Sequence, residues 1–389
     1  MDVTQQGILL LLKSAITEEP QALPEGFDIE SAYPLIQKHH MITLCYDGAV
    51  RCGVSRQHPV MRQLFAGYCK ALAISEGQMR QINRVFRAFD ENGIDYMPLK
   101  GCNMKAIYPK PELRIMGDAD ILVRVEQYEQ IKPLMTLLGF SPVLESDHEL
   151  TWKSPGLYLE LHKRLIPTPN KDFYAYYGDG WHLARHKTGG CCSMMAEDEF
   201  IYLFTHFSKH YRAGGIGCRH VLDLWVYLRT KPEMDEAYIC AQLEHLHLLE
   251  FFKNIRRLMA MWFEGTTGDE KLEYMSEYVF SSGSFGRMEE WMRSMAIRRS
   301  KCLKYKPNEK LMYMCTHLFP RIGQIRNQYP FLEKWPLLLP VIWIVRPVQK
   351  ILFDRHSIVR TFQDMKLMDR EQIDKKHQML RYVGLDYNF

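Results

Sequence analysis

The 389-residue sequence lacks several features that mark specialised classes of protein. Its ten cysteines show no C-x-x-C spacing and include one adjacent pair, Cys191-Cys192, so neither a zinc ribbon nor a disulfide framework is supported. The formal net charge is only +4, whereas proteins that track nucleic-acid phosphates concentrate lysines and arginines on one face. We therefore expect reduced thiols, a cytoplasmic location and no nucleic-acid partner.

Long hydrophobic runs are also missing. The amino-terminal stretch MDVTQQGILLLLKSAI carries Asp2 and no basic residue before its short apolar run, which indicates a helix start and not an export signal. The apolar segment 335–345 contains Pro336 and Pro340 and is too short to cross a hydrocarbon core of about 30 Å. We expect no transmembrane segment, and we expect 335–345 to be buried, with contact to a membrane interface as the alternative.

The composition is that of a folded globular protein, with 47% hydrophobic and 25% charged residues. The length exceeds the size at which one hydrophobic core usually stops growing, so two or three packed units are expected. The basic segment RRSKCLKYKPNEK, residues 298–310, is predicted to be an exposed loop. It is interpreted as a solvated linker, with a phosphate-binding patch as the alternative.

Residues 1–92 are predicted to form a helical region. Within 61–89 the apolar residues recur at spacings of three, four and seven, which describes one face of a helix: Leu72, Met79, Ile82, Phe86 and Phe89. The sequence ENGID ends this pattern, with Gly93 as the residue that closes the helix.

A second pattern begins at Tyr96, where short apolar runs alternate with turn residues. It predicts strands at 96–100 and 119–125 and a helix at 126–138, closed by Gly139, in which Pro133 removes a backbone donor. It also predicts a hairpin that pairs ELTWK with LYLELH around the turn sequence Ser-Pro-Gly at 154–156.

Residues 93–195 therefore form a predicted α/β core, and the acidic start of AEDEFIYLFTHFSKHYR opens a second helical region, 196–389. The expected fold class is α+β, with a mixed β-sheet core between helical amino-terminal and carboxy-terminal regions.

The stretch IMGDADILV places two carboxylates inside an apolar strand. Side chains at i and i+2 of a strand share a face, so Asp118 and Asp120 are expected to point the same way. Like charges held this close repel, a cost that a divalent cation between them offsets, and hard oxygen ligands suit Mg²⁺ or Mn²⁺. The alternative is that Asp118 caps a turn and Asp120 is a solvated residue at a strand edge.

Two further features favour a site. Upstream, the sequence LKGCN, residues 99–103, ends a predicted strand at Gly101, where backbone N–H groups opening a helix can approach a phosphate. Downstream, LYLELHK offers Glu160 as a third carboxylate on a neighbouring strand, and His162 shares its strand face.

These elements, taken in order, resemble a known family. The stretches MPLKGCNMKAIYP, LRIMGDADILV, LYLELHKRL and FIYLFTHFSKHYR followed by CRHVLDLWVYL are similar to the bacterial family of uncharacterised nucleotidyltransferases, within the nucleotidyltransferase or polymerase-beta-like fold. The resemblance extends from about residue 30 to residue 345. It implies a nucleotidyltransferase-like core and transfer of a nucleoside monophosphate from an NTP, ATP foremost, with release of pyrophosphate.

The resemblance also implies roles for individual residues. Asp118, Asp120 and Glu160 would be catalytic and would hold Mg²⁺ or Mn²⁺, with Glu160 as ligand or as base for the acceptor hydroxyl. Nucleotide binding would involve Lys100, Gly101, Cys102, Asn103 and Arg114, and Cys102 departs from the small or hydroxylated residue of the wider fold. Exposure to solvent is the alternative for Lys100 and Arg114.

The acceptor side is predicted to include His162 and residues of the later helices: His206, Lys209, His210 and Asp223, with Arg219 nearby. Core packing or a structural hydrogen bond is the alternative for the histidines. The acceptor is expected to be a small molecule or a peptide. Two other functions stay open, a catalytically silent nucleotide-binding or toxin–antitoxin module and an RNA-modifying transferase; the modest net charge disfavours the latter.

The carboxylate hypothesis has a direct consequence for mutation. Asp120→Asn is expected to abolish transfer, because an amide cannot supply the charge that holds Mg²⁺. In metal-free buffer the same change is expected to relieve repulsion between neighbouring carboxylates.

Overall fold

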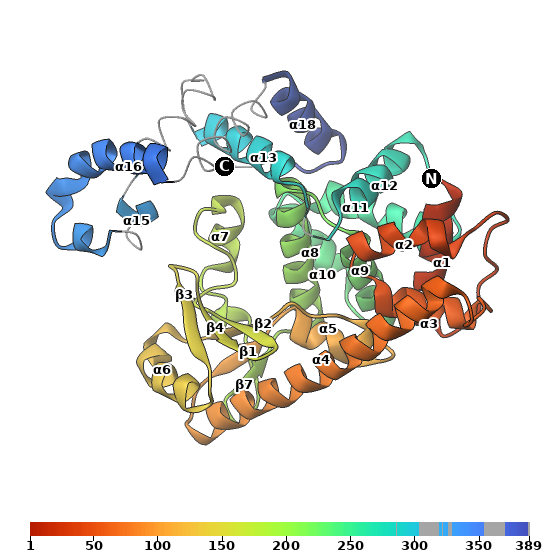
Figure 1. The fold of residues 1–389 in the computed structure, drawn as a ribbon, viewed down its shortest axis with the longest axis horizontal. Coiled ribbons are helices and arrows are strands. Elements are labelled where there is room, and N and C mark those ends of the chain that lie inside the picture. The colour runs from red at the N-terminus through yellow and green to blue at the C-terminus, as the bar shows by residue number, and fades with distance from the viewer. Residues whose placement is uncertain (285, 303–318, 321, 326–328, 354–369, 388–389) are drawn as a thin grey trace.

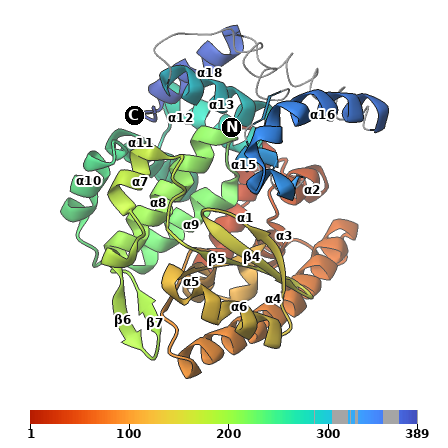
Figure 2. The same cartoon turned by 90° about the vertical axis from the view of Figure 1, so that its left-hand side faces the viewer.

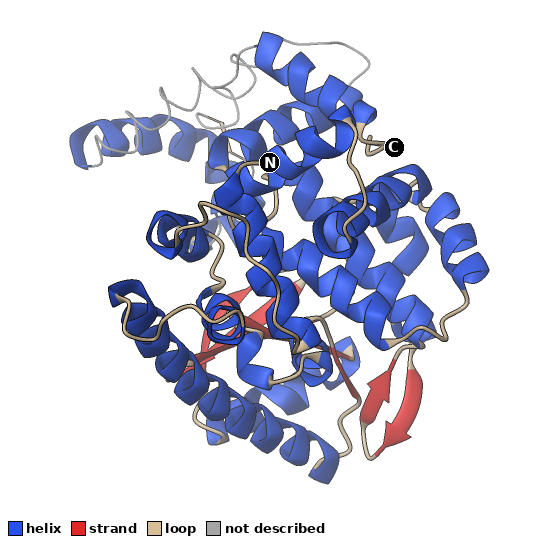
Figure 3. Ribbon diagram, turned by 90° about the vertical axis from the view of Figure 1, so that its right-hand side faces the viewer, coloured by secondary structure: helices blue, strands red, loops and turns tan. Residues whose placement is uncertain are grey.

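The computed structural model describes residues 1–284, 286–302, 319–320, 322–325, 329–353 and 370–387. A seven-stranded mixed sheet of order β3-β4-β5-β2-β1-β7-β6 lies low in the molecule, and helices from both ends of the chain surround it (Figures 1 and 3). The predicted α+β class with a nucleotidyltransferase-like core is confirmed. The strands are β1 Tyr96–Pro98, β2 Asp118–Val123, β3 Ser141–Glu145, β4 Glu149–Ser154, β5 Leu157–His162, β6 Arg185–Thr188 and β7 Cys191–Ser193.

The register of the central strands follows the alternation in the sequence. β2 pairs in parallel with β5 and antiparallel with β1, so it has a hydrogen-bonded neighbour on each side. β4 and β5 form the predicted hairpin, in which Ser154 pairs with Leu157 and Gly156 takes a positive φ of 82° at the turn. β2 is therefore an interior strand: its first half pairs with β5, its second half lies between β5 and β1, and the Leu99 N–H donates to the Asp120 carbonyl at 3.0 Å.

Some strand predictions were wrong in extent or missed entirely. β1 ends at Pro98, two residues before the predicted end, and β2 runs from Asp118 to Val123 in place of 119–125. β3, β6 and β7 were not predicted, because the side chains of β3 and β6 are all exposed and their sequences carry no apolar alternation. The β6–β7 hairpin projects from the edge of the sheet (Figure 2).

The amino-terminal region is helical, as predicted. In its first helix the Asp2 side chain accepts a hydrogen bond from the Gln5 backbone N–H at 2.7 Å, which satisfies a donor that the helix cannot. In the long fourth helix Ile82 is buried as predicted but Leu72 is exposed, and Gly93 follows its end with a φ of 63°. The helices are α1 Val3–Thr17, α2 Ile29–Lys38, α3 Ile42–Arg51 and α4 Pro59–Glu91.

Two helices cover one face of the sheet. Residues of α4 and of α6, Tyr128–Leu137, form a cluster with the inward side chains of β2 and β5. Pro133 lies inside α6 without ending it, and the helix starts after a separate short turn, Val125–Gln127 (η2), so the predicted helix 126–138 is divided near its start. The other helical segments of this region are η1 Pro111–Leu113, α5 Gly101–Ile107, α7 Lys171–Tyr177 and η3 Trp181–Leu183.

The opposite face of the sheet packs on the carboxy-terminal helices, which stand above it in Figure 1. One buried cluster includes Leu12 of α1, Leu99 beyond β1 and Phe204 of α8, so the two helical regions share a core. The boundaries at residues 92 and 195 stay predictions. The helical segments here are α8 Ala196–Ala213, α9 Cys218–Thr230, α10 Glu236–His245, α11 Leu249–Met259, a π-helical turn Ala260–Glu264 (η4), α12 Glu270–Ser282, α13 Met288–Cys302, α15 Ile322–Ile325, η5 Pro330–Glu333, η6 Pro336–Leu338, α16 Leu339–Phe353 and α18 Arg370–Tyr382.

Two predictions for the carboxy-terminal region need correction. Residues 298–302 end helix α13 and are not part of a loop; 303–310 lie outside the described residues. The segment 335–345 is not buried as predicted: Leu337 is 93% exposed and Ile344 72%, while Ile342 packs against Leu332 in a small local cluster. Among the described residues no helix has the length and apolar content that a membrane crossing requires.

Candidate active site

A cleft of about 760 Å³ opens between the sheet and the carboxy-terminal helices. It is bordered by the starts of β2 and β4, by β5, and by α8 and α9, and its lining contains most of the residues that the sequence singled out. The predicted site residues found there are Lys100, Gly101, Arg114, Asp118, Asp120, Glu160, His162, His206, Lys209, Arg219, His210 and Asp223. The structure thus brings together groups that are up to 123 residues apart in the chain, counting from Lys100 to Asp223.

The carboxylates lie on two adjacent parallel strands. Asp120 of β2 is in register with Glu160 of β5, so their side chains are direct cross-strand neighbours. The intervening β2 residues Ala119 and Ile121 are buried in the cluster on the other face of the sheet. Asp120 is only 5% exposed, on an interior strand, so the alternative of a solvated residue at a strand edge is wrong. Asp118 is exposed at the first position of β2.

Asp120 already has a cationic partner. The Lys100 Nζ donates a hydrogen bond to Asp120 Oδ1 at 2.7 Å, and His162 Nε2 lies 2.8 Å from the same oxygen. Burial alone would raise the pKa of Asp120, but Lys100 and the hydrogen bond from His162 hold that pKa well below its usual range. Asp120 is therefore ionised at neutral pH, and the ammonium group of Lys100 balances its negative charge.

Glu160 is in the opposite state. Burial, together with the negative charges of Asp118 and Asp120, raises the pKa of Glu160 to about 8. His162 Nε2 is 3.6 Å from Glu160 Oε2, too far for a hydrogen bond, so Glu160 lacks the compensation that Lys100 gives to Asp120. Two paired carboxylates with opposite protonation are a common arrangement in acid–base sites.

The donor atoms suit a divalent ion. Ligand atoms of Asp120, Glu160 and His162 all lie within 4.8 Å of one another, a group that could hold a metal. Asp118 is not a member of that group, although the negative charge of Asp120 contributes to raising its pKa. The expected repulsion between carboxylates therefore contributes to the raised pKa values of Asp118 and Glu160, while the ion pair with Lys100 offsets it at Asp120.

Of the residues at the start of α5 that were predicted to bind the nucleotide, two border the cleft and two do not. Lys100 has a positive φ of 43°, a strained conformation for a lysine, and with Gly101 it borders the cleft. The Asn103 side chain instead donates to the Pro98 carbonyl at 2.9 Å and to Glu199. Cys102 packs at the edge of the sheet's apolar cluster, and burial raises its pKa to about 12. Neither Cys102 nor Asn103 is part of the cleft lining, so their predicted contact with a nucleotide is not supported by this geometry.

Arg114 is held by groups that lie far away in the sequence. Its Nε donates to Asp223 Oδ1 at 2.7 Å, and the Tyr108 hydroxyl donates to the same oxygen at 2.7 Å. Arg114 is only 9% exposed, so the alternative of a solvated arginine is wrong. Asp223 also borders the cleft, so its ion pair with Arg114 leaves its acceptor-side role a prediction. Arg219 Nη1 donates to the adjacent Ile115 carbonyl.

Three predicted residues of α8 form the wall of the cleft that faces the sheet. His206 Nε2 and His210 Nε2 are 3.1 Å apart, as the i, i+4 spacing predicts. Lys209 lies between them in sequence, and burial and the charge of Lys100 lower its pKa to about 8. Their position by the carboxylates is compatible with an acceptor-side role, and that role stays a prediction.

The comparison with family models decides the family. A model described as "Uncharacterised nucleotidyltransferase" matches residues 25–264, which is more than half of the chain and includes every residue of the cleft named so far. The chain belongs to the uncharacterised nucleotidyltransferase family. Membership supports nucleotidyl transfer as the general activity. Comparisons with curated proteins and with solved structures gave no significant match.

The cleft of this nucleotidyltransferase family member also contains residues that the sequence did not single out. His148 and Glu149 stand at the start of β4, and His40 and His220 lie toward α9. His148 directly precedes the predicted hairpin strand ELTWK and Glu149 is its first residue, where adjacent polar residues look like an ordinary turn. The pairing of Glu149 with His162 across β4 and β5 was the available signal, because the predicted hairpin register implies it.

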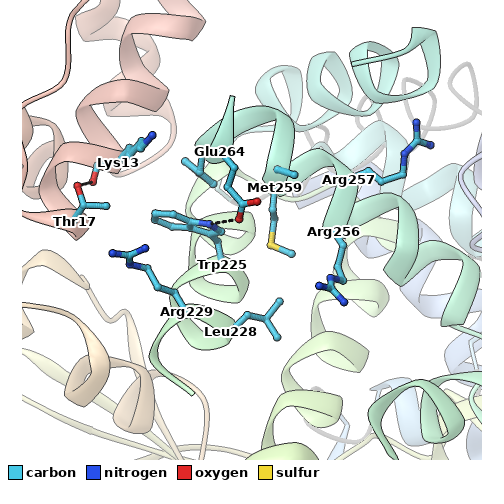
Figure 4. Close-up of a pocket in the computed structure, with 11 residues that line it drawn as sticks. Lys13, Thr17, Trp225, Leu228, Arg229, Arg256, Arg257, Met259 and Glu264 are labelled. Carbon is cyan, nitrogen blue, oxygen red and sulfur yellow. Dashed lines mark hydrogen bonds between the residues drawn. The ribbon is translucent and has the colours of Figure 1, made fainter. Parts of the chain in front are cut away.

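A second cavity, of about 700 Å³, lies among the helices away from the sheet (Figure 4). Trp225 of α9 lies at its centre and donates through Nε1 to Glu264 at 3.2 Å. Its basic residues include Lys13, Arg229 and Arg256, and Arg256 is already paired with Glu236. None of the predicted site residues borders this cavity, so the sheet-side cleft is the candidate active site.

Proposed function

We propose that the protein is a metal-dependent nucleotidyltransferase that moves a nucleoside monophosphate from an NTP, with ATP preferred, to a hydroxyl or similar group of a small molecule or peptide, releasing pyrophosphate. The observation that carries the proposal is the register of Asp120 with Glu160 inside a cleft that also contains Asp118. Cations from three other segments, Lys100, Arg114 and Lys209, border the same space, as an NTP's phosphates require.

The residues present fit Mg²⁺ or Mn²⁺. Asp118, Asp120 and Glu160 offer hard carboxylate oxygens, and the uncompensated charge that raises the pKa of Glu160 is the charge that a dication would neutralise. When bound, such ions would polarise the α-phosphate and neutralise the leaving pyrophosphate in an in-line displacement. His162, whose Nε2 lies 2.8 Å from Asp120, would orient that carboxylate.

The chain's own side chains would then do the remaining work. Glu160, once ionised, would accept the proton of the acceptor hydroxyl. Lys100 would exchange its contact with Asp120 for the triphosphate, and Arg114, kept in place by Asp223, would add a fixed positive charge beside it. The wall formed by His206, Lys209 and His210 would contact the acceptor.

The test is incubation of the full chain with each α-labelled NTP, with Mg²⁺ or Mn²⁺, and with a small-molecule extract or a peptide extract of cells. The proposal expects label to move to an acceptor with stoichiometric pyrophosphate release, and Asp120→Asn to stop both. A catalytically silent binding module would instead show metal-dependent NTP binding with no pyrophosphate. If RNA is labelled instead, and the labelling falls steeply with salt, the acceptor is RNA and not a small molecule or peptide.

A further inference from the structure

A second group of potential metal ligands lies next to the catalytic carboxylates. It consists of His148, Glu149 and His162, whose ligand atoms are within 4.8 Å of one another. Glu149 opens β4 and is in register with His162 at the end of β5, so the antiparallel pairing itself holds these two side chains together. His148 is the residue before Glu149, and its ring meets that of His162 edge-on, with centroids 4.8 Å apart.

The spacing of the ligand atoms fits one four-coordinate ion. His162 Nδ1 is 3.2 Å from His148 Nε2, and Glu149 Oε2 is 3.8 Å from each of these nitrogens. A tetrahedral zinc ion with bonds of about 2.0–2.1 Å separates its ligand atoms by about 3.4 Å. A small movement of the Glu149 carboxylate is enough to complete three corners of such a site.

The hydrogen bonds of His162 suit a ligand. Its Nε2 faces the ionised Asp120 carboxylate at 2.8 Å, and a carboxylate only accepts, so Nε2 carries the proton. When the ring carries only that proton, Nδ1 presents a lone pair toward His148 and Glu149. A ligating imidazole whose other N–H donates to a carboxylate is the usual arrangement around protein-bound zinc. Asp120 thus fixes the tautomer that leaves Nδ1 free to bind.

His148 has no other evident structural role. Its Nε2 is hydrogen-bonded to His162, while its Nδ1 is buried without a partner among the described residues. The orientation of this ring is therefore set by the ligand group itself.

The local charge also calls for a cation. Four carboxylates border this part of the cleft, Asp118, Asp120, Glu149 and Glu160, against the ammonium groups of Lys100 and Lys209 and the guanidinium of Arg219, while the guanidinium of Arg114 is paired with Asp223. Of these, Lys100 is paired with Asp120, and Lys209 has a lowered pKa because it is buried near Lys100. One dication bound at Glu149 would neutralise that carboxylate, and the other carboxylates would remain available to bind the cations that accompany an NTP.

We propose that His148, Glu149 and His162 form a site for a transition metal of the zinc class, distinct from the carboxylate site for Mg²⁺ or Mn²⁺, with its fourth position open to the cleft. Two imidazoles and one carboxylate select such a metal, whereas Mg²⁺ prefers six oxygen ligands. The site stands whether or not the chain transfers nucleotides. Through His162 and Asp120 it would be coupled to the neighbouring carboxylates.

Cobalt is the probe that reports geometry. The full chain, stripped of metal with EDTA, is titrated with Co²⁺ in excess Mg²⁺ while its visible absorption is recorded. The proposal expects one equivalent with the intense bands of four-coordinate cobalt, and displacement of that cobalt by Zn²⁺. Weak six-coordinate bands, or thiolate charge-transfer bands from the cysteines, would place the ion elsewhere and overturn it, as would no binding.

Matched variants assign the ligands. His148→Gln and Glu149→Gln should each weaken Co²⁺ binding by at least about 10- to 100-fold. His186→Gln, on the exposed β6 strand, should leave it unchanged. Folding of each variant is checked by its stabilisation with Mn²⁺ and an NTP, which uses the other site. If Asp118→Asn abolishes cobalt binding and both hairpin variants retain it, the ion belongs to the catalytic carboxylates and the second site does not exist.

Failure of this proposal is separable from failure of nucleotidyl transfer. Loss of the Mn²⁺–NTP response in Asp120→Asn, in a protein whose wild type binds no cobalt at the second site, would support the catalytic site alone. A cobalt site in a protein that never releases pyrophosphate would support the second site alone. Should His148→Gln fail to fold, Glu149→Gln carries the test, because its side chain is partly exposed and keeps its shape.

Discussion

Replacing Asp120 by asparagine should destabilise the metal-free protein, the reverse of the expectation from sequence alone. The substitution removes the charge that compensates the Lys100 ammonium, whose side chain is only 17% exposed. Breaking a buried pair by removing one partner costs about 3–5 kcal/mol, and the asparagine oxygen can still accept one hydrogen bond from Lys100 or His162. We therefore expect a loss of about 2–4 kcal/mol in the free energy of unfolding at neutral pH.

The assay is urea unfolding of wild type and variant in EDTA, followed by the same measurement with Mn²⁺ and an NTP. Because the folded-state pKa of Asp120 lies below its ordinary 3.8, its contribution is fully present above that pH and is lost as the pH falls toward the folded value. The difference in unfolding free energy between wild type and Asp120→Asn should therefore become smaller at acid pH. Mn²⁺ with NTP should stabilise only the wild type.

Asp118→Asn is the matched control, since Asp118 is on the same strand but exposed, and it forms no ion pair within 4 Å with the described residues. Its removal should change stability by no more than about 0.5 kcal/mol, or raise it slightly, because desolvation in the cleft and the charge of Asp120 both raise the pKa of Asp118 and so disfavour its ionised form. A Lys100→Met background should shrink the Asp120→Asn penalty through their coupling. Equal stability of both aspartate variants would refute the assigned charge balance.

Three other substitutions test separate parts of the structure. Because the pKa of Glu160 is raised to about 8, ionising it costs the folded state: metal-free stability should fall by about 2–4 kcal/mol between pH 4.5 and 8, and Glu160→Gln should flatten that slope in urea titrations. Asp223→Asn leaves Arg114 incompletely paired and should cost about 3 kcal/mol in unfolding free energy while raising the apparent Kd for an NTP in calorimetry. In Gly190→Ala the added Cβ would lie 2.0 Å from the Ile94 carbonyl oxygen, so the β1–β7 edge should open, measured as faster amide exchange there.

Local patterns were sufficient for the elements that carry the proposed catalytic carboxylates. The alternation in DADILV fixed which face Asp118 and Asp120 share, because a strand allows only two faces. The Ser-Pro-Gly turn fixed the register of β4 with β5, since a short hairpin loop leaves little freedom. Glu160 was predicted on a neighbouring strand, but the parallel pairing of β2 with β5, which places it beside Asp120, was not predicted because it does not follow from local sequence.

Charge partners could not be predicted in the same way. Arg114 and Asp223 are separated by 109 residues, and neither has a local pattern that names the other. Lys100 looked like a phosphate ligand or a solvated residue, and its contact with Asp120 depends on a positive φ that few lysines adopt. The prediction that segment 335–345 is buried was wrong for a related reason. Apolar content leads to burial only where another element covers the residues.

The contrast between Asp120 and Glu160 explains how one pair of strands can hold both a permanent anion and a latent base. The two residues are in register and share the same neighbours, yet Lys100 reaches only Asp120. Glu160 therefore keeps its proton at neutral pH until positive charge arrives in the cleft, since its pKa is about 8 without compensation. Under the proposed function, Glu160 would become a base only when the nucleotide and its cations are in place, so the free enzyme would not have to hold an ionised Glu160 beside Asp118 and Asp120.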